Sequence, residues 1–172
     1  MPVNVEIKAR VDDMDSLRER VRALAGCDAR VLRQEDTFFQ IPSGRLKLRV
    51  IDETQGELIY YERCDEPGPT PSEYLISPVA DPEAFKEVLS AALGVRGVVR
   101  KERELFMIGR TRVHLDEVEG LGSFVELEVV LAPEEPAETG HDEAQELLEM
   151  LLIPPADLAD TAYIDLVESR AA

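Results

Sequence analysis

Apolar and polar residues alternate along most of the first 131 positions, which is the pattern of β-strands that bury one face. Between positions 3 and 11, Val5 and Ile7 lie on one side of the expected strand, while Glu6 and Lys8 lie on the other. Because side chains repeat with a period of two, each strand has one apolar and one polar face. The pattern predicts eight strands, over residues 3–11, 29–40, 45–51, 57–64, 73–79, 95–107, 110–118 and 122–131.

Four helices are predicted from the signals at their ends. Asp12-Asp13 caps a helix over 14–25 that Gly26 ends, and Asp81-Pro82 opens a helix that Gly94 ends. Two further helices are expected at 141–152 and 157–168, after a loop at 132–140 that is rich in proline and acidic residues. The stretch 65–72, rich in proline and glycine, is expected to be a loop and not a linker between domains.

Strands that follow one another through short turns pair antiparallel, so the expected fold class is α+β with a mainly antiparallel sheet. A sheet of eight such strands either closes into a barrel or stacks as a sandwich. At 172 residues the chain is long enough to bury a core. We expect a single domain over 1–172, with its strands within 3–131 and the C-terminal helices within 141–168.

The overall charge is strongly negative, with 36 acidic and 19 basic residues and a formal net charge of −17. A surface with this field repels nucleic acid duplexes and anionic membranes, which disfavours both as partners. The two cysteines, Cys27 and Cys64, lack the spacing of a zinc site or of a disulfide framework. Neither a signal peptide nor a run of apolar residues that could span a bilayer is recognisable, so a cytoplasmic location is expected.

Most of the bases nevertheless gather on the polar faces of the expected strands. Those faces hold four acidic residues, Glu6, Asp116, Glu126 and Glu128, beside ten basic ones: Lys8, Arg10, Arg45, Lys47, Arg49, Arg63, Lys101, Arg103, Arg110 and Arg112. A solvated antiparallel face would mix the signs, because like charges placed opposite one another are destabilising. If the face lines an enclosed interior, its cations require an anion, and guanidinium and ammonium groups at this density match phosphate. The pattern favours a phosphate pocket over a solvated face.

Two carboxylates on one strand face are a second element of the pattern. Glu126 and Glu128 are two positions apart, and carboxylate oxygens are hard ligands that Mg²⁺ or Mn²⁺ takes beside the oxygens of a polyphosphate. Glu6 is a candidate for a third ligand. His114 lies on the same charged face, where it either contacts ligand or metal or is a hydrogen-bonded residue of the wall.

Five segments match a known family in their order along nearly the whole chain: EIK at 6–8, DTFF at 36–39, RLKLR at 45–49, VRKER at 99–103 and LDEVEGLGSFVELE at 115–128. Together they resemble the CYTH superfamily, the triphosphate tunnel metalloenzymes, and most closely its class IV adenylyl cyclase-like branch. The resemblance implies a closed eight-stranded antiparallel barrel with about four flanking helices, whose tunnel holds a triphosphate and a divalent metal, Mg²⁺ or Mn²⁺. Members cyclise ATP to cyclic AMP with release of pyrophosphate, or hydrolyse thiamine triphosphate, inorganic triphosphate or RNA 5′-triphosphates.

Carried over to this chain, the resemblance implies metal ligands at Glu6, Asp116, Glu126 and Glu128, and catalytic roles for Glu6 and Lys8. The expected substrate-binding residues are Lys8, Arg10, Arg45, Lys47, Arg49, Arg63, Lys101, Arg103 and Arg112. Two positions depart from the family pattern. Asn4 stands where the family has the first glutamate of its opening signature, and Arg63 is a shifted substitute for a lysine of the fourth strand.

The expected function is a metal-dependent reaction on a triphosphate, with an adenylyl cyclase-like activity first. The alternatives are a triphosphatase and a non-catalytic binder of polyphosphate or nucleotide, while a lipocalin-like carrier would need an apolar lumen. The expected partner is a nucleoside triphosphate or another triphosphate, and the branch implies a possible homodimer. Tyr163 either covers a tunnel mouth, as the resemblance suggests, or anchors the last helix.

Overall fold

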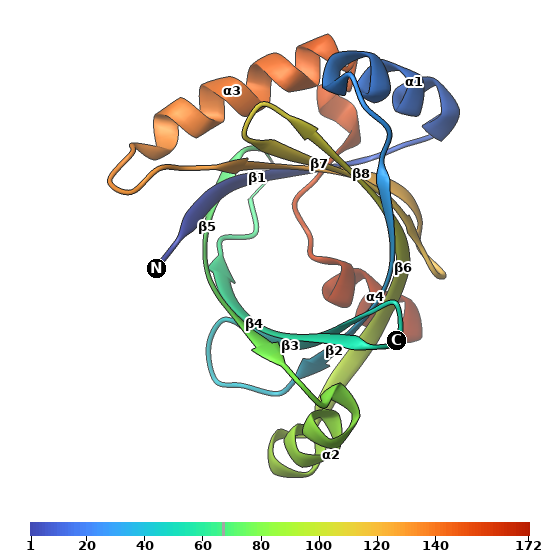
Figure 1. Ribbon diagram of the computed structural model, residues 1–172, viewed down its shortest axis with the longest axis vertical. Coiled ribbons are helices and arrows are strands. Elements are labelled where there is room, and N and C mark those ends of the chain that lie inside the picture. The colour runs from blue at the N-terminus through green and yellow to red at the C-terminus, as the bar shows by residue number, and fades with distance from the viewer. Residues whose placement is uncertain (67) are drawn as a thin grey trace.

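The computed structural model describes residues 1–66 and 68–172 and forms a closed antiparallel β-barrel with four α-helices (Figure 1). The barrel strands are β1 (Val3–Arg10), β2 (Arg30–Phe39), β3 (Arg45–Ile51), β4 (Gln55–Arg63), β5 (Thr70–Val79), β6 (Val95–Ile108), β7 (Thr111–Val118) and β8 (Gly122–Val130). A short ninth strand, β9 (Leu158–Ala159), pairs with the end of β1. The prediction of a closed eight-stranded barrel is confirmed.

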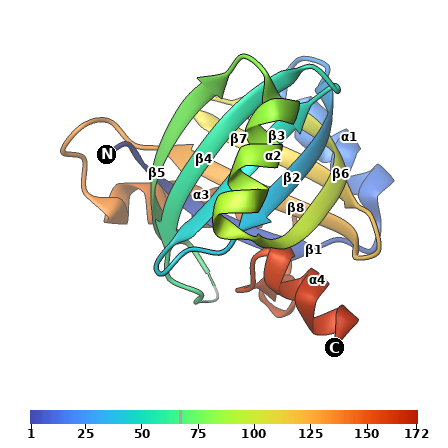
Figure 2. The same cartoon turned by 90° about the horizontal axis from the view of Figure 1, so that it is seen from below.

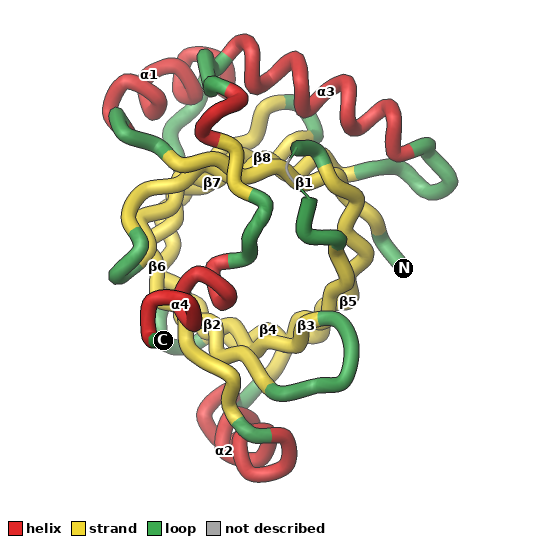
Figure 3. The backbone as a smooth tube through the Cα atoms, turned by 180° about the vertical axis from the view of Figure 1, so that it is seen from behind, coloured by secondary structure: helices red, strands yellow, loops and turns green. Residues whose placement is uncertain are grey.

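The ring closes because the first strand pairs on both sides. The strand order is β5-β4-β3-β2-β6-β7-β8-β1, and β1 also pairs with β5, where Asn4 lies opposite Ser72 and Glu6 opposite Thr70. Along its other edge β1 pairs with β8, where Lys8 lies opposite Glu126 and Glu6 opposite Glu128. Figure 3 shows the resulting ring of strands from behind. Residues of β1, near the start of the chain, therefore lie beside residues of β8 in the same part of the barrel wall.

The helices cover part of the outside of the barrel and one of its ends. Helices α1 (Met14–Ala25) and α3 (Ala137–Met150) lie over the part of the wall that contains β1, β7 and β8, and α2 (Pro82–Leu93) lies outside β2, β3 and β4 (Figure 1). The 3₁₀ turn η1 (Pro155–Asp157) leads through β9 to α4 (Tyr163–Ala171). Figure 2 shows α4 at one end of the barrel, beyond the strand ends. This end of the barrel is called the α4 end.

The main hydrophobic core lies outside the ring, between the barrel wall and the helices. Outward-facing Val5 and Leu127 pack in one buried cluster with Leu17 of α1 and Leu147 of α3. Gly140 lets α3 approach closely, because a Cβ at this position would lie 2.7 Å from Cγ2 of Val5. Since the apolar faces are buried under helices, the polar faces of the same strands point into the barrel.

The predicted element boundaries hold where local signals mark them and fail near the C-terminus. The bounds of α1 and β3 are as predicted, whereas α3 begins at Ala137, inside the stretch predicted as a loop, and not at 141. The segment predicted as a helix over 157–168 contains the end of η1, β9 and only then α4. The predicted loop 65–72 is shorter than expected because β5 begins at Thr70, and its residue 67 lies outside the described residues.

None of the described helices combines the length and the apolar character that crossing a membrane requires.

Candidate functional site: a charged cavity inside the barrel

The polar faces of the eight strands line a cavity of about 290 Å³ inside the barrel. Its walls carry five acidic side chains, Glu6, Asp36, Glu57, Glu126 and Glu128, and eight basic ones: Lys8, Arg30, Lys47, Arg49, Arg63, Lys101, Arg103 and Arg112. Seven of these bases are buried or half-buried in the interior, whereas Arg30, at the start of β2, is exposed. An excess of positive charge in an enclosed space favours the binding of an anion.

One buried carboxylate organises the cations of β3. Asp36 on β2 lies beside Arg49, whose Nε and Nη2 donate hydrogen bonds of 2.8 Å each to its two oxygens. Lys47 Nζ donates a third bond of 2.9 Å, and Lys101 Nζ lies 3.6 Å from the same carboxylate. Burial raises the pKa of Asp36, but the three cations outweigh burial and hold that pKa well below its usual range. The single carboxylate of Asp36 therefore holds three basic side chains in place, and their positive charge exceeds its negative charge.

Asp116 of β7 is a second buried carboxylate, and it holds the guanidinium of Arg103 of β6 in place. Arg103 donates two bonds of 2.7 Å to the carboxylate of Asp116, and the hydroxyl of Tyr163 donates another of 2.9 Å. The ring of Tyr163 lies under two ammonium groups, 3.9 Å from Lys8 Nζ and 5.0 Å from Lys101 Nζ. Tyr163 thus lines the cavity beside α4, and its ring lies close to two of the cations.

The pKa values of three lysines in the cavity lie below the ordinary lysine value. Burial and the neighbouring guanidinium of Arg103 lower the pKa of Lys101 to about 7. Burial also lowers the pKa of Lys8 to about 8, although Glu126 acts in the opposite direction. Burial and Arg49 lower the pKa of Lys47. An anion bound among these groups would raise each of these pKa values again, because it stabilises the charged form.

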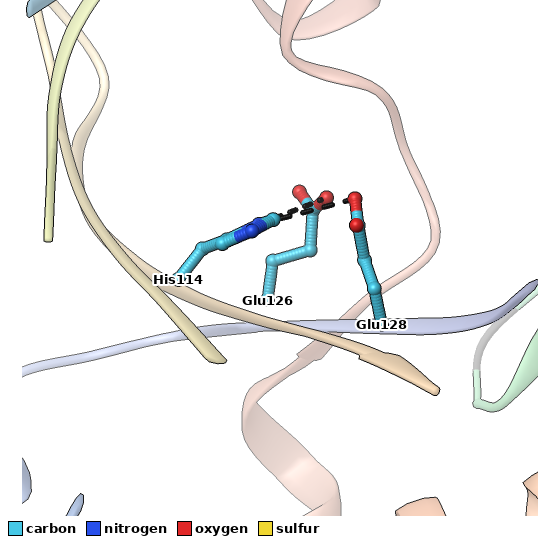
Figure 4. A group of neighbouring side chains, drawn as sticks. All are labelled: His114, Glu126 and Glu128. Atoms are coloured by element: carbon cyan, nitrogen blue, oxygen red, sulfur yellow. Dashed lines mark ion pairs between the residues drawn. The ribbon is translucent and has the colours of Figure 1, made fainter. Parts of the chain in front are cut away.

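Carboxylates gather on the opposite wall, formed by β1, β7 and β8. His114, Glu126 and Glu128 offer one ligand atom each, all within 4.8 Å of one another (Figure 4). Burial raises the pKa of Glu6 and of Glu128, and the proximity of Glu126 adds to both shifts. The three glutamates therefore repel one another across this wall, which a divalent cation would relieve.

The carboxylate wall fits a divalent metal ion in its donor chemistry. Two buried polar atoms on it have no hydrogen-bond partner among the described residues, Oδ1 of Asn4 and Nδ1 of His114. Buried polar atoms are normally paired, so atoms left open in this way favour a ligand that they would contact. Arg63 reaches the same wall, with Nη1 3.5 Å from Oε2 of Glu6.

Most of the residues expected from the sequence lie in the cavity, and three do not. Arg10 is exposed at the end of β1, where its guanidinium lies 5.0 Å from the centre of the Phe124 ring. Arg45 is held by Asp65 and Asp165 near α4. Asp116, expected as a metal ligand, is buried behind Arg103. It is outside the cavity lining because Arg103 and Tyr163 occupy its oxygens.

Arg110 also departs from the expected charged face. It precedes β7 and forms ion pairs with Glu135 and with Glu143 of α3. Conversely, Asp36 and Arg30 line the cavity although they were absent from the charged face inferred from the sequence. The alternation of β2, which places Arg30, Gln34 and Asp36 on one side, carries the signal for both residues.

Comparisons with known proteins agree with this architecture. The chain is 27% identical over 173 residues to a Methanocaldococcus jannaschii protein named "Putative adenylate cyclase", covering 95% of this chain and 98% of that protein. The PH1012 protein from Pyrococcus horikoshii superposes with a TM-score of 0.84 at 26% identity, over 95% of this chain and 98% of that one.

A more distant structure, the Hippeastrum protein HpAC1, superposes with a TM-score of 0.65 at 17% identity, over 94% of this chain and 91% of that one. It is described as a "Putative adenylyl cyclase" with a dominant triphosphatase activity. At this identity the likeness supports the fold alone. The family model of the CYTH domain matches residues 3–163, which is nearly the whole chain. The chain belongs to the CYTH domain family.

Proposed function

We propose that this protein is a metal-dependent enzyme that binds the triphosphate of a nucleoside triphosphate inside the barrel and, as its first candidate reaction, converts ATP to cyclic AMP and pyrophosphate. The observation that carries the proposal is the convergence of eight cations on an interior with five carboxylates. A triphosphate has enough charge and enough oxygen acceptors to match this set. The cyclase name of the relative from Methanocaldococcus jannaschii supports the choice of reaction.

One wall of the cavity would bind the phosphates, and the opposite wall would bind the metal. Lys47, Arg49 and Lys101 on one side are placed to donate to phosphate oxygens, and Arg103 is fixed by Asp116 to do the same. Preorganised donors of this kind stabilise the charge that develops on a leaving pyrophosphate. On the other wall, Glu6, Glu126 and Glu128 would hold Mg²⁺ or Mn²⁺. When bound, such an ion neutralises phosphate oxygens as a Lewis acid.

Glu6 and Lys8 are the proposed catalytic residues of β1. Burial and Glu126 raise the pKa of Glu6. A carboxylate that holds the metal through one oxygen keeps its second oxygen, which is suited to accept the proton of the attacking hydroxyl. Lys8 lies between the two walls, with Nζ 3.9 Å from Glu126 Oε2 and over the Tyr163 ring. Its ammonium is placed to contact a phosphate that spans from the cations to the carboxylates.

Apolar side chains line the cavity beside α4, with Phe38 and Val99, and also at the end away from α4, which favours a substrate with an organic group. Leu32, Ile51 and Leu105 face the cavity from β2, β3 and β6. Leu105 lies eight positions beyond Gly97, where α4 packs, and therefore roughly 26 Å further along β6. A nucleoside in this part of the barrel would place its phosphates among the cations. Inorganic tripolyphosphate would leave these apolar side chains without a partner.

Hydrolysis of a triphosphate is the second candidate reaction. Both reactions use the same phosphate-binding cations and differ in the nucleophile, which is water for a triphosphatase and the ribose 3′-hydroxyl for a cyclase. The triphosphatase activity ascribed to the Hippeastrum protein of the same fold is the observation that favours this alternative.

Product analysis tests the proposal. The purified protein is incubated with ATP, tripolyphosphate and thiamine triphosphate, each with Mg²⁺ and with Mn²⁺. Cyclic AMP with pyrophosphate supports the first candidate, and orthophosphate supports the second. Tight binding without any product would indicate a binding protein, and neither binding nor turnover of any triphosphate would refute the proposal.

A matched pair of arginines controls for general loss of positive charge. Arg49 points into the cavity, whereas Arg100 lies on the outer face of β6 and binds Glu35. We expect Arg49→Gln to lower turnover by about 10- to 100-fold, because a charge-assisted hydrogen bond to phosphate is lost. Arg100→Gln is expected to leave turnover unchanged. Equal effects of the two changes would contradict binding inside the barrel.

A further inference from the structure

His114 has a buried imidazole whose Nδ1 points at the carboxylates of β8. Its side chain is 5% exposed, and Nδ1 lies 3.8 Å from Oε1 of Glu126 and 3.9 Å from Oε1 of Glu128 (Figure 4). The same Nδ1 atom is buried and has no hydrogen-bond partner among the described residues. A residue that only builds the wall would be expected to satisfy this atom, because an unpaired buried polar atom is destabilising.

The backbone places the three side chains at neighbouring positions on the inner face of one wall. His114 on β7 lies directly opposite Glu126 on β8, and Glu128 follows two positions later on the same face. Adjacent strands of a closed barrel cannot slide against each other, so the register of β7 and β8 fixes the backbone positions from which the three side chains extend. A site built on paired strands is more exact than a site built on loops.

The distances between the ligand atoms of His114, Glu126 and Glu128 are close to those around one shared metal ion. Metal–ligand bonds of about 2.1 Å place neighbouring ligand atoms of an octahedron about 3 Å apart and opposite ones about 4.2 Å apart. The distances of 3.8 and 3.9 Å from Nδ1 lie between these two values, and all three ligand atoms lie within 4.8 Å of one another, so small side-chain rotations would bring them to one ion.

The neighbouring cations leave the carboxylates accessible. Lys8 and Arg103 each lie 3.9 Å from Glu126, and Arg112 lies 3.6 Å from Glu128. All three separations are longer than a hydrogen bond, so these cations do not occupy the carboxylate oxygens.

We propose that His114 is a metal ligand through Nδ1, together with Glu126 and Glu128, and that its nitrogen makes the site prefer Mn²⁺ over Mg²⁺. This inference rests on the metal site of the proposed function and specifies which ion that site takes. Mg²⁺ prefers an all-oxygen environment, whereas imidazole nitrogen is a ligand typical of transition-metal ions. Glutamates alone would give a site without this selectivity.

The chain provides its own control for a spectroscopic test. It has two histidines, His114 and His141, and His141 lies on α3 outside the barrel. The holoprotein is prepared with Mn²⁺ alone, and electron spin echo envelope modulation detects ¹⁴N coupled to the bound ion. We expect the modulation of an imidazole nitrogen in the wild type and in His141→Gln, and its loss in His114→Gln.

Equilibrium binding of each ion supplies a second readout that needs no enzyme activity. We expect His114→Gln to weaken Mn²⁺ binding by about 10- to 100-fold and to change Mg²⁺ binding by a much smaller factor. Equal losses for both ions would overturn the selectivity. The wild-type spectrum requires no variant, so a folding defect of His114→Gln cannot hide the answer.

The outcomes separate this inference from the proposed function. Bound Mn²⁺ without nitrogen modulation in the wild type would overturn the role of His114, while the glutamate site would stand. Modulation that survives in His114→Gln and is lost in His141→Gln would also overturn it. If Mn²⁺ does not bind the wild type at all, both this inference and the metal-dependent function fail.

Discussion

Replacing Asp36 with asparagine removes one negative charge from the group of three cations that surrounds it. The carboxylate accepts two bonds of 2.8 Å from Arg49 and one of 2.9 Å from Lys47, and Lys101 lies at 3.6 Å. The asparagine side chain would keep the shape of the aspartate and one oxygen acceptor. It would leave the guanidinium of Arg49, which cannot lose its proton at any accessible pH, without a counterion.

The expected loss of stability follows from the burial of this pair. Asp36 is 1% exposed, and breaking one partner of a buried ion pair costs about 3–5 kcal/mol. For a domain of this length, each kcal/mol lowers Tm by about 2–4 °C, which corresponds to a fall of about 6–20 °C. Because the pKa of Asp36 lies well below its usual range, its stabilisation is fully present at pH 7 and is lost only as the pH falls below the ordinary carboxyl range.

Thermal unfolding at pH 7, with and without tripolyphosphate, measures the effect. In Asp36→Asn the cations have lost their internal anion, so tripolyphosphate should raise Tm by more than it does in the wild type. The adjacent Glu35 is the control, since it binds Lys86 and Arg100 on the outer face of the barrel and is 29% exposed. Glu35→Gln should cost about 1 kcal/mol or less. A Tm unchanged by Asp36→Asn would show that this ion pair does not stabilise the fold, and an equal response of both proteins to tripolyphosphate would show that the anion does not bind these cations.

Three further outcomes are expected. Tyr163→Phe removes the 2.9 Å bond to Asp116 and should lower the unfolding free energy by about 1.5–3 kcal/mol in denaturant titrations; an unchanged midpoint would contradict this. Triphosphate binding at pH 8 should take up about one proton or more, because the pKa of Lys101 is lowered to about 7 and a bound anion raises it; calorimetry should then depend on the ionisation enthalpy of the buffer, and independence would contradict the shift. Gly140→Ala should lower Tm through overpacking worth about 1–3 kcal/mol, because the new Cβ would lie 2.7 Å from Val5; a stabilised variant would contradict the tight docking of α3.

The strands could be predicted from the sequence because alternation is a local signal. Helix α1 could be predicted to the residue because both ends are marked locally: Asp13 accepts a bond from the backbone of Ser16, and Gly26 adopts a φ of 69°. Helix α3 has no side chain that caps its start, so the position of its first turn was not visible in the sequence. The C-terminal segment forms β9 through pairing with β1, which is a contact between distant parts of the chain.

The site was predictable to the extent that the faces of the strands determine it. Glu6, Lys8, Arg49 and Lys101 point into the cavity as their positions in the alternation require. The positions at strand ends were not predictable in the same way. Whether Arg45 faces the cavity or an acidic partner depends on where α4 packs, because Asp165 of α4 binds its guanidinium.

The role of Asp116 also depends on a contact between strands. Its register opposite Arg103 and the position of Tyr163 decide that it fixes a cation, and neither can be derived from the spacing of residues within β7.

Cations from many strands converge inside the barrel, and we propose that they bind a triphosphate there beside a divalent metal. A crystal structure of the protein with tripolyphosphate and Mn²⁺ would show both ligands, because anomalous scattering locates the metal. We expect phosphate density between Arg49, Lys101 and Arg103, with manganese at Glu126 and Glu128. Ligand density confined to the outer surface, or a barrel interior without phosphate at saturating concentration, would contradict the proposal.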